Sequence, residues 1–294
     1  MNNSDINDPL FLQAVHALDT GNIAELETLI EAYPRLVRER LITEEDGYFK
    51  DPYLIWFVAD NPIRNPKLPP NIVEVTRLLV QAVKREAPDS YQEQLDYTLG
   101  LVATGRIPRE CGAQIDMMDL LIDAGATPGG GMGALAHGNV GAAQHLINRG
   151  GKLTLTSAIC LERIDDIHGL ATMASPGEKL AALTAAAFYG KADMVRFLLS
   201  AGADPNGFPE SKNGFHNHAT PLHQAVSSGS LDTVKLLVEA GGRLDVADKI
   251  YDGTPLEWAM YMQKDDDYDE ERKKKFALIE AYLRGKTSST YSTI

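Results

Sequence analysis

A two-helix unit recurs along this chain, and its recurrence limits the possible folds more than any other sequence feature. Residues 182–206, "ALTAAAFYGKADMVRFLLSAGADPN", and residues 221–246, "PLHQAVSSGSLDTVKLLVEAGGRLDV", follow one plan. Each has a small-residue helix, a glycine, a second helix with a leucine pair, and a turn that carries another glycine. Self-similarity of this kind is typical of solenoids, in which each unit packs against its neighbours. The pattern therefore predicts an all-α stack of helix pairs.

The residues of this unit explain why it stacks. Small side chains such as Ala185 on the first helix allow a neighbouring helix to approach closely. The second helices carry the pairs Leu198–Leu199 and Leu236–Leu237, which recur at helical spacing and supply an apolar stripe that a helix of a soluble protein turns toward the core. Gly202 and Gly241 follow these helices, at the position where a left-handed cap forms and a Cβ atom is unfavourable. The unit is thus a helix pair closed by a glycine turn.

The stretch "TPLHQAVSSGSLDTVKLLVEAGGRLDV", which begins at Thr220, adds a specific start signal. Thr220 can cap the helix, and Pro221 occupies the first helical position, where its missing N–H costs nothing. This stretch closely resembles an ankyrin repeat, which has a T-P-L-H-x-A signature and a period of about 33 residues. The pattern restarts as "TPLEWA" at Thr254, 34 residues after Thr220. The resemblance implies stacked helix pairs joined by β-hairpin fingers, and the distribution of insertions resembles that of a subset of bacterial ankyrin proteins.

Eight such pairs can be placed along residues 1–284, which we predict to form a single all-α ankyrin-repeat solenoid. The predicted pairs span residues 10–32, 52–85, 94–126, 131–152, 153–178, 179–206, 219–246 and 253–284. Little sequence separates the fourth, fifth and sixth pairs, so we expect short or missing fingers there. Conversely, "DPNGFPESKNGFHNHATP" lengthens one finger. The last residues, 285–294, are predicted to be a disordered tail.

A glycine run at residues 128–133, "PGGGMG", has the form of a nucleotide site. Gly129, Gly131 and Ala134 fit G-x-G-x-x-A, a fingerprint in which a strand precedes a helix whose first N–H groups hold a pyrophosphate. The preceding "DMMDLLIDAGA" has helical character, and no ribose-binding acid stands about 20 residues further on. We therefore predict that the glycines replace a finger with a flexible turn.

Three further patterns lack residues that their chemistry needs. "GKT" at residues 285–287 has Glu280 where a P-loop needs its first glycine. "DDDYDEERKKK" has neither the glycine nor the final glutamate of a calcium-binding EF-hand loop. Cys111 and Cys160 have no ready histidine base, and their number gives no disulfide framework. We predict no cofactor, no metal and no enzymatic activity.

Three histidines near one loop support an alternative. His216 and His218 fall on one side of an extended loop at residues 204–219, and His223 follows on the next helix. Imidazoles are common metal ligands, so the alternative is a ligand- or metal-binding protein, or an enzyme, with its site near this loop. In the structural interpretation two are loop residues, and the resemblance implies that His223 bonds the neighbouring turn and Thr220.

The charge of the chain narrows the choice of partner. Its 294 residues include 28 basic and 41 acidic ones, which give a net charge of −13. An acidic chain gains nothing from a phosphate backbone, so we expect no nucleic acid partner, whereas a partner protein with a basic surface is favoured. No apolar run approaches the length needed to cross a membrane, and the first residues lack a signal-peptide pattern. We expect a cytoplasmic monomer with no membrane association.

The resemblance implies a non-enzymatic module that binds a partner protein through a concave groove and its finger loops. Two positions of the repeat's A-A-x-x-G pattern face this groove, and aromatic anchors there would dominate binding. As an alternative, Phe188 or Tyr189 packs under a neighbouring finger, and the finger that carries Phe208 and Phe215 folds back on itself. The predicted contact residues are Asp60, Thr104, His137, Phe188, Tyr189, Phe208, Phe215, Ser227, Ser228, Tyr261 and Met262.

Overall fold

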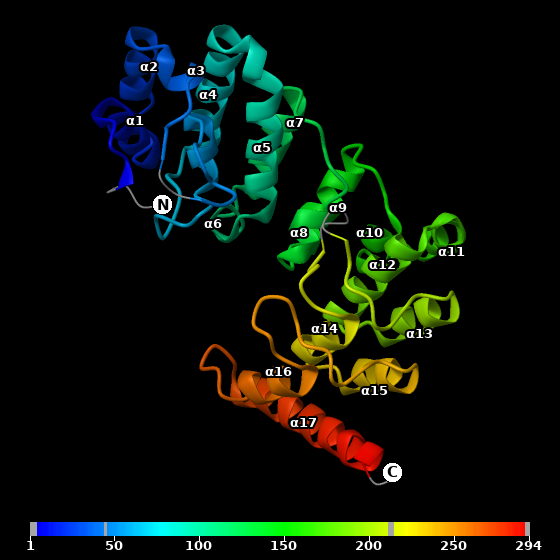
Figure 1. The fold of residues 1–294 in the computed structure, drawn as a ribbon. Helices are drawn as coiled ribbons and strands as arrows, with labels where there is room; N and C mark the ends of the chain where they lie inside the picture. The colour runs from blue at the N-terminus through cyan, green and yellow to red at the C-terminus, as the bar shows by residue number, and fades with distance from the viewer. Residues whose placement is uncertain (1–4, 44–45, 211–214, 292–294) are drawn as a thin grey trace. The chain divides into compact units, whose positions relative to one another are not determined.

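The computed structural model describes residues 5–43, 46–210 and 215–291, and the chain divides into two compact units. Unit 1 comprises Met1–Lys152, and unit 2 comprises Leu153–Ile294. Within the described residues the regular elements are helices, with no strand among them (Figure 1). The predicted all-α fold is therefore confirmed. The boundary between the units lies between the fourth and fifth predicted pairs.

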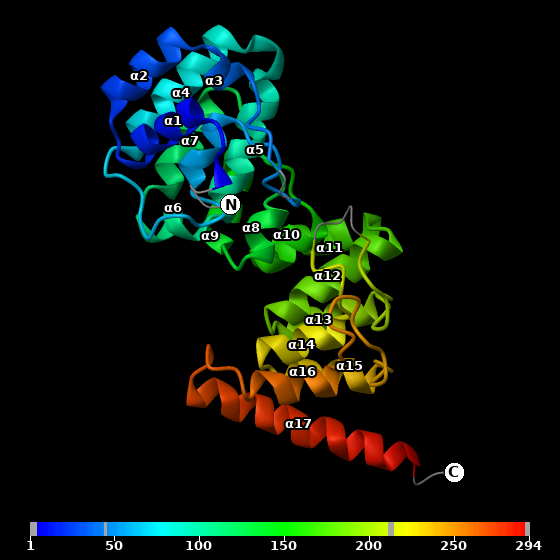
Figure 2. The same cartoon turned by 60° about the vertical axis from the view of Figure 1, so that its left-hand side comes forward.

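Unit 1 contains the first four helix pairs, with short additional helices between them. Its elements are α1 (Pro9–Asp19), α2 (Ile23–Ala32), α3 (Arg35–Arg38), the 3₁₀ helix η2 (Leu54–Ala59), α4 (Ile72–Glu86), η3 (Pro88–Ser90), α5 (Tyr91–Thr104), α6 (Arg106–Glu110), α7 (Gln114–Asp123), α8 (Met132–Ala136) and α9 (Val140–Asn148). The first elements of the pairs, α1, η2, α5 and α8, contact one another in succession. The second elements, α2, α4, α7 and α9, form another row in the same order (Figure 2).

Unit 2 contains the last four pairs and repeats this arrangement. Its helices are α10 (Leu155–Cys160), α11 (Ile164–Met173), α12 (Pro176–Phe188), α13 (Ala192–Ser200), α14 (Pro221–Ser228), α15 (Leu231–Glu239), α16 (Pro255–Met262) and α17 (Glu270–Tyr291). The first helices, α10, α12, α14 and α16, contact one another in succession, and α13, α15 and α17 do the same (Figure 1). The repeat pattern is thus expressed as two rows of helices.

The core of unit 2 lies between these rows. Ala186 of α12 and Ala225 of α14 are fully buried, and their small side chains let the two helices pack closely, as predicted. Leu198 of α13, Leu237 of α15 and Ile279 of α17 enter the same core from the other row. Burying one such large side chain stabilises the fold by about 1.5–3 kcal/mol. This packing holds α12, α14 and α16 in succession.

Helix α17 is longer than the sequence analysis predicts. It continues to Tyr291, so the disordered tail predicted for residues 285–294 is wrong over most of its length, and residues 292–294 lie outside the described part. Arg284 donates a hydrogen bond of 2.7 Å to Glu280 one turn earlier, a spacing that supports helix propagation. A single glycine after this pair does not end the helix, because its cost is only about 1 kcal/mol.

The glycine run lies between two helices. Helix α7 precedes it, so the helical interpretation of that segment is confirmed, and the described residues contain no strand for a dinucleotide fingerprint. Gly131 has a φ of +73° and precedes α8, which has only five residues. A Cβ atom on Gly151 would lie 2.3 Å from the carbonyl oxygen of Gly129. The glycines therefore serve close packing inside unit 1 as well as the turn.

Candidate functional site

The "TPLH" segment builds the scaffold of the site. Thr220 caps α14, and both its N–H (3.3 Å) and its hydroxyl (2.7 Å) lie within hydrogen-bond distance of His223 Nδ1. His223 Nε2 donates in turn to the carbonyl oxygen of Gly253, 3.0 Å away in the next loop. Burial lowers the pKa of His223, which keeps the ring neutral. The predicted structural role of this histidine is confirmed, and both of its nitrogens are engaged.

A buried carboxylate organises the loop that precedes α16. Asp248 accepts hydrogen bonds from the N–H groups of Ile250 (2.8 Å) and Tyr251 (2.8 Å), and from that of Gly253 (3.0 Å). The indole Nε1 of Trp258 donates a further bond of 2.9 Å to the same carboxylate. Burial acts to raise the pKa of Asp248, but these hydrogen bonds outweigh it and lower the pKa to about 2. Asp248 thus joins the loop to the first turn of α16.

The loop and α16 enclose a pocket on the surface of unit 2, with a volume of about 640 Å³. It is lined by Tyr251, Asp252, Gly253, Glu257, Trp258, Tyr261, Met262 and Asp265. Tyr251 is 74% exposed and Tyr261 is 69% exposed, whereas Trp258 and Met262 are half-buried against the core. The lining contains three aromatic rings and three carboxyl groups, but no lysine or arginine. We call this the α16 pocket.

The carboxyl groups of the α16 pocket are held by local hydrogen bonds. Glu257 accepts from the backbone N–H and the hydroxyl of Thr254, each at 2.8 Å, which completes a capping box at the start of α16. The backbone hydrogen bond and then the hydroxyl lower the pKa of Glu257. Asp265 accepts from the N–H of Asp267 at 3.0 Å. These contacts leave a negative rim around an aromatic floor.

Two of the predicted contact residues line this pocket, and the others have different surroundings. Tyr261 and Met262 belong to the α16 pocket. Ser227 and Ser228 are half-buried at the end of α14, where the hydroxyl of Ser228 donates to the carbonyl of Ala225 at 2.7 Å. Tyr251 and Trp258 also line the pocket but are not among the predicted contact residues. The restart at "TPLEWA" was the available signal, since it places Trp258 on the first helix of the last pair.

Phe188 and Phe215 show that the long finger folds back on unit 2. The ring centroid of Phe188 lies 4.7 Å from that of His216 and 5.5 Å from that of Phe215. Phe215 is 0% exposed, so its prediction as a contact residue is wrong: the loop turns this ring into the interior. Phe188 is half-buried, and the alternative in which it packs under a finger describes its surroundings.

Two other predicted aromatic anchors are half-buried in unit 2. Burial raises the pKa of Tyr189, which follows α12 as its C-cap. Phe208 lies in the finger, and the Nζ atom of Lys249 lies 4.3 Å from the centroid of its ring. Phe208 therefore already has a cationic neighbour from its own unit.

The predicted contact residues of unit 1 do not form one surface with exposed anchors. Asp60 is 1% exposed and lies beside the buried Arg64 at 3.3 Å, so its prediction as a contact residue is wrong. The insertion after η2 places this guanidinium over the ring of Phe57, with Cζ 4.9 Å from its centroid. Burial raises the pKa of Asp60. Thr104 is half-buried and accepts from Asn61 Nδ2 at 3.0 Å. His137 is exposed, with Nδ1 2.9 Å from a backbone carbonyl.

The histidine alternative receives little support from the finger. The ring centroids of His216 and His218 lie 5.9 Å apart, and His218 stacks 6.2 Å from Trp258. His223 is committed to structural hydrogen bonds, and residues 211–214 of the finger lie outside the described part. Over the described ranges, no group of three or more histidine, cysteine, aspartate or glutamate side chains is arranged to hold a metal ion.

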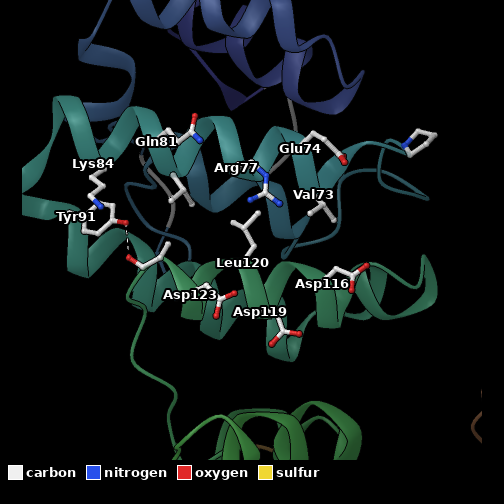
Figure 3. A pocket seen from close by; sticks show the side chains of 13 residues that line it. Val73, Glu74, Arg77, Gln81, Lys84, Tyr91, Asp116, Asp119, Leu120 and Asp123 are labelled. Carbon is white, nitrogen blue, oxygen red and sulfur yellow. Dashed lines mark hydrogen bonds between the residues drawn. The ribbon is translucent and has the colours of Figure 1, made fainter.

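A second hollow, of about 700 Å³, lies in unit 1 between α4 and α7. Figure 3 shows Arg77 pointing from α4 toward α7, which carries Asp119 and Asp123. Asp119 pairs with His145 of α9 at 2.8 Å and with Arg149, the C-cap residue of that helix, and Asp123 pairs with Arg149. Charges of both signs line this hollow, and several are paired within unit 1. It lacks the exposed aromatic rings of the α16 pocket.

Comparisons with known proteins agree with this repeat architecture. A family model for ankyrin repeats in three copies matches residues 111–248 and 183–268, which together cover more than half of the chain. An ankyrin repeat-containing protein of Schizosaccharomyces pombe is 46% identical over 72 residues, or 24% of this chain and 31% of that protein. The chain therefore matches less than a third of this curated relative. Because the relative is fungal, the suggested bacterial subset has no support.

Similar solved structures include two ankyrin repeat domains. That of human ASB11 is 16% identical, with a TM-score of 0.30, and the match covers 93% of this chain and 98% of that one. That of Bcl-3 is 18% identical, with a TM-score of 0.31, and the match covers 93% of this chain and 99% of that one.

Among the helices of the described residues, none has the length and apolar character that a membrane span requires.

Proposed function

We propose that this chain, which belongs to the ankyrin-repeat family, binds a partner protein and has no enzymatic activity. Domains of this family are typically protein-interaction modules and are usually non-catalytic. The proposed surface is the part of unit 2 formed by the end of α16 and the loop before it, with the half-buried ends of α12 and α14 beside it. The proposal includes no cofactor, metal or nucleic acid, and treats the protein as a cytoplasmic monomer.

The exposed rings of the α16 pocket carry this proposal. Tyr251 and Tyr261 are mostly solvent-accessible, and Trp258 and Met262 form the floor between them. Exposed apolar groups that gather around a hollow are typical of interaction sites. Aromatic side chains are also enriched among the few residues that dominate interface energies, where truncation costs about 2 kcal/mol or more. A partner that covers these rings would remove them from water.

The charge of the same surface indicates the kind of partner. Asp252, Glu257 and Asp265 surround the rings, and the whole chain has a net charge of −13. Opposite charge on a partner would accelerate encounter and fix its orientation. We therefore propose a partner protein with a basic surface. Binding should weaken as salt is added, because the rim carboxylates are exposed to screening.

The experiment that tests the proposal is affinity capture with matched variants. One bait carries Tyr251→Ala and Tyr261→Ala. The control bait carries Tyr33→Ala and Met173→Ala, which remove exposed apolar side chains outside the pocket. We expect a protein captured by the wild type and the control bait to be lost from the pocket variant, with circular dichroism unchanged. Equal capture by all three baits would show that the partner binds elsewhere.

A further inference from the structure

We propose that the α16 pocket binds the guanidinium group of an arginine side chain presented by the partner protein. This inference rests on the proposed function and specifies its chemistry. The pocket combines three aromatic rings with three carboxyl groups, and no residue of its lining carries a positive charge. An aromatic face attracts a cation through its quadrupole, and a carboxylate attracts it as an ion pair.

Unit 1 already contains a guanidinium group that is bound by aromatic rings and a carboxylate. In unit 1 the Cζ atom of Arg40 lies 4.3 Å from the ring centroid of Tyr53 and 5.0 Å from that of Trp56. The same guanidinium forms an ion pair with Glu93 and donates a hydrogen bond of 2.9 Å to the carbonyl of Asp51. A tyrosine, a tryptophan and a carboxylate thus jointly bind one arginine side chain. We call this the Arg40 cluster.

The α16 pocket offers the same residue types on an open surface. Trp258 is fixed by its hydrogen bond to Asp248, so its ring has a defined position. Tyr251 and Tyr261 add two mostly exposed rings, and Glu257 is held in its capping box on the same turn as Trp258. The difference from the Arg40 cluster is that the cation would come from another protein.

The chemistry favours arginine over lysine and over a neutral side chain. A guanidinium is planar, so it stacks on an aromatic face while its edge donates two parallel hydrogen bonds to a carboxylate. An ammonium is more strongly hydrated and gains less from leaving water. A neutral side chain of similar shape would bury apolar area but would leave the three carboxyl groups without a counter-charge. The volume of about 640 Å³ admits a long side chain together with adjoining peptide backbone.

The fluorescence of Trp258 gives a direct test. The chain has two tryptophans, so Trp56→Phe leaves Trp258 as the reporter. Acetylated, amidated Gly-Arg-Gly is titrated into this protein, and peptides with lysine, citrulline or norleucine in the central position are compared. Citrulline is the neutral isostere of arginine. We expect saturable binding of the arginine peptide with a Kd on the order of millimolar, and at least about tenfold weaker binding of citrulline, a difference of about 1.4 kcal/mol. Equal binding of arginine and citrulline would overturn the proposal.

Removing the charge without the shape tests the carboxyl groups. The pocket variant carries Asp252→Asn, Glu257→Gln and Asp265→Asn. Glutamine also serves in a capping box, and asparagine tolerates the positive φ of +54° at position 252. The control carries Asp193→Asn, Asp232→Asn and Glu239→Gln, which remove the same charge from exposed positions elsewhere in unit 2. We expect arginine binding to fall about tenfold in the pocket variant alone. Equal binding in both variants would contradict the inference.

This titration and the capture experiment can fail separately. If capture of the partner requires Tyr251 and Tyr261 but the protein binds the arginine and citrulline peptides equally, the proposed function holds and the arginine inference is overturned. If the pocket prefers the arginine peptide but wild type and pocket variant capture the partner equally, the pocket chemistry holds and the proposed partner surface is overturned. Loss of both would overturn both proposals.

Discussion

The Arg40 cluster of unit 1 and the α16 pocket of unit 2 use similar residues in different ways. In the first, Trp56 is 3% exposed, and the ring contributes to the interior beside an arginine of its own unit. In the second, Trp258 is half-buried, and its tyrosine neighbours face solvent. Residue type alone therefore does not separate a structural aromatic cluster from a binding surface. The two sites differ in how deeply the tryptophan is buried and in whether an arginine of the same unit contacts its ring.

The largest difference between the two sites should appear in stability. We expect Trp56→Ala to lower the free energy of unfolding by about 3–5 kcal/mol, because the truncation leaves a cavity in the interior of unit 1. Urea unfolding followed by circular dichroism measures this loss, with Tyr33→Ala as an exposed control. A loss below about 1 kcal/mol would show that the cluster is not part of the packed interior.

The next largest effect on stability should come from replacing Asp248, whose hydrogen bonds hold the loop and Trp258 of the α16 pocket. We expect Asp248→Ala to cost about 1–3 kcal/mol, because several donors that it satisfies lose their acceptor. The emission of Trp258 should shift as well, since the indole loses its hydrogen bond. Asp245→Ala, at an exposed ion pair with Arg243, is the matched control. An unchanged emission spectrum would mean that the loop is held by other contacts.

Acidification should weaken unit 2 through its buried histidine. Burial lowers the folded-state pKa of His223, so as the pH falls below about 6.5 the unfolded chain takes up a proton that the folded chain resists. The contribution of His223 to the free energy of unfolding is therefore fully present above this pH and decreases as the pH falls toward the lowered pKa. Burial also lowers the pKa of His218, which acts in the same direction. Asp248, with a pKa of about 2, stays ionised here and adds its own loss only below about pH 4.

This dependence can be isolated by comparing the wild type with His223→Gln between pH 7.5 and 5. Glutamine keeps a capping-box acceptor but does not titrate. We expect the unfolding midpoint of the wild type to fall over this range and that of the variant to fall less. Parallel curves would show that His223 does not control the acid response.

The smallest effect on stability should come from the surface of the pocket. We expect Tyr261→Ala to change the free energy of unfolding by no more than about 0.5 kcal/mol, because most of this ring is in water. The same substitution should cost about 2 kcal/mol of partner affinity if Tyr261 is an anchor. Isothermal titration with the captured partner measures the second quantity. A large loss of stability would assign Tyr261 to the core instead.

The sequence predicts the repeat units well where their local signals are complete. The start of α14 at Pro221, its capping by Thr220 and the bond from His223 to the next loop all follow from the "TPLH" pattern. The structure also has buried alanines between α12 and α14, as the small-residue pattern predicts. These features depend on neighbours within one repeat or between adjacent repeats, so a local pattern contains them.

The candidate site is less predictable because insertions decide which side chains are covered. Asp60 and Phe215 occupy positions that would be exposed in a regular repeat, but the insertion that carries Arg64 and the long finger bury them. Tyr251 and Trp258 line the same pocket, and Asp248 accepts a hydrogen bond from the backbone of the first and from the indole of the second. No periodic pattern encodes this arrangement, so the repeat pattern predicts Tyr261 without these two neighbours.

The bonds that Asp248 receives from the loop come from backbone N–H groups, which every residue except proline possesses. The hydrogen bonds that hold the loop therefore do not depend on the side chains at positions 250 and 251, whereas the φ of +54° at position 252 favours aspartate, asparagine or glycine. Positions 250 and 251 can change their chemistry while the carboxylate, the indole and α16 keep their geometry. The α16 pocket is thus a site whose selectivity evolution or an engineer can alter by exchanging the loop tip, at little risk to the fold that presents it.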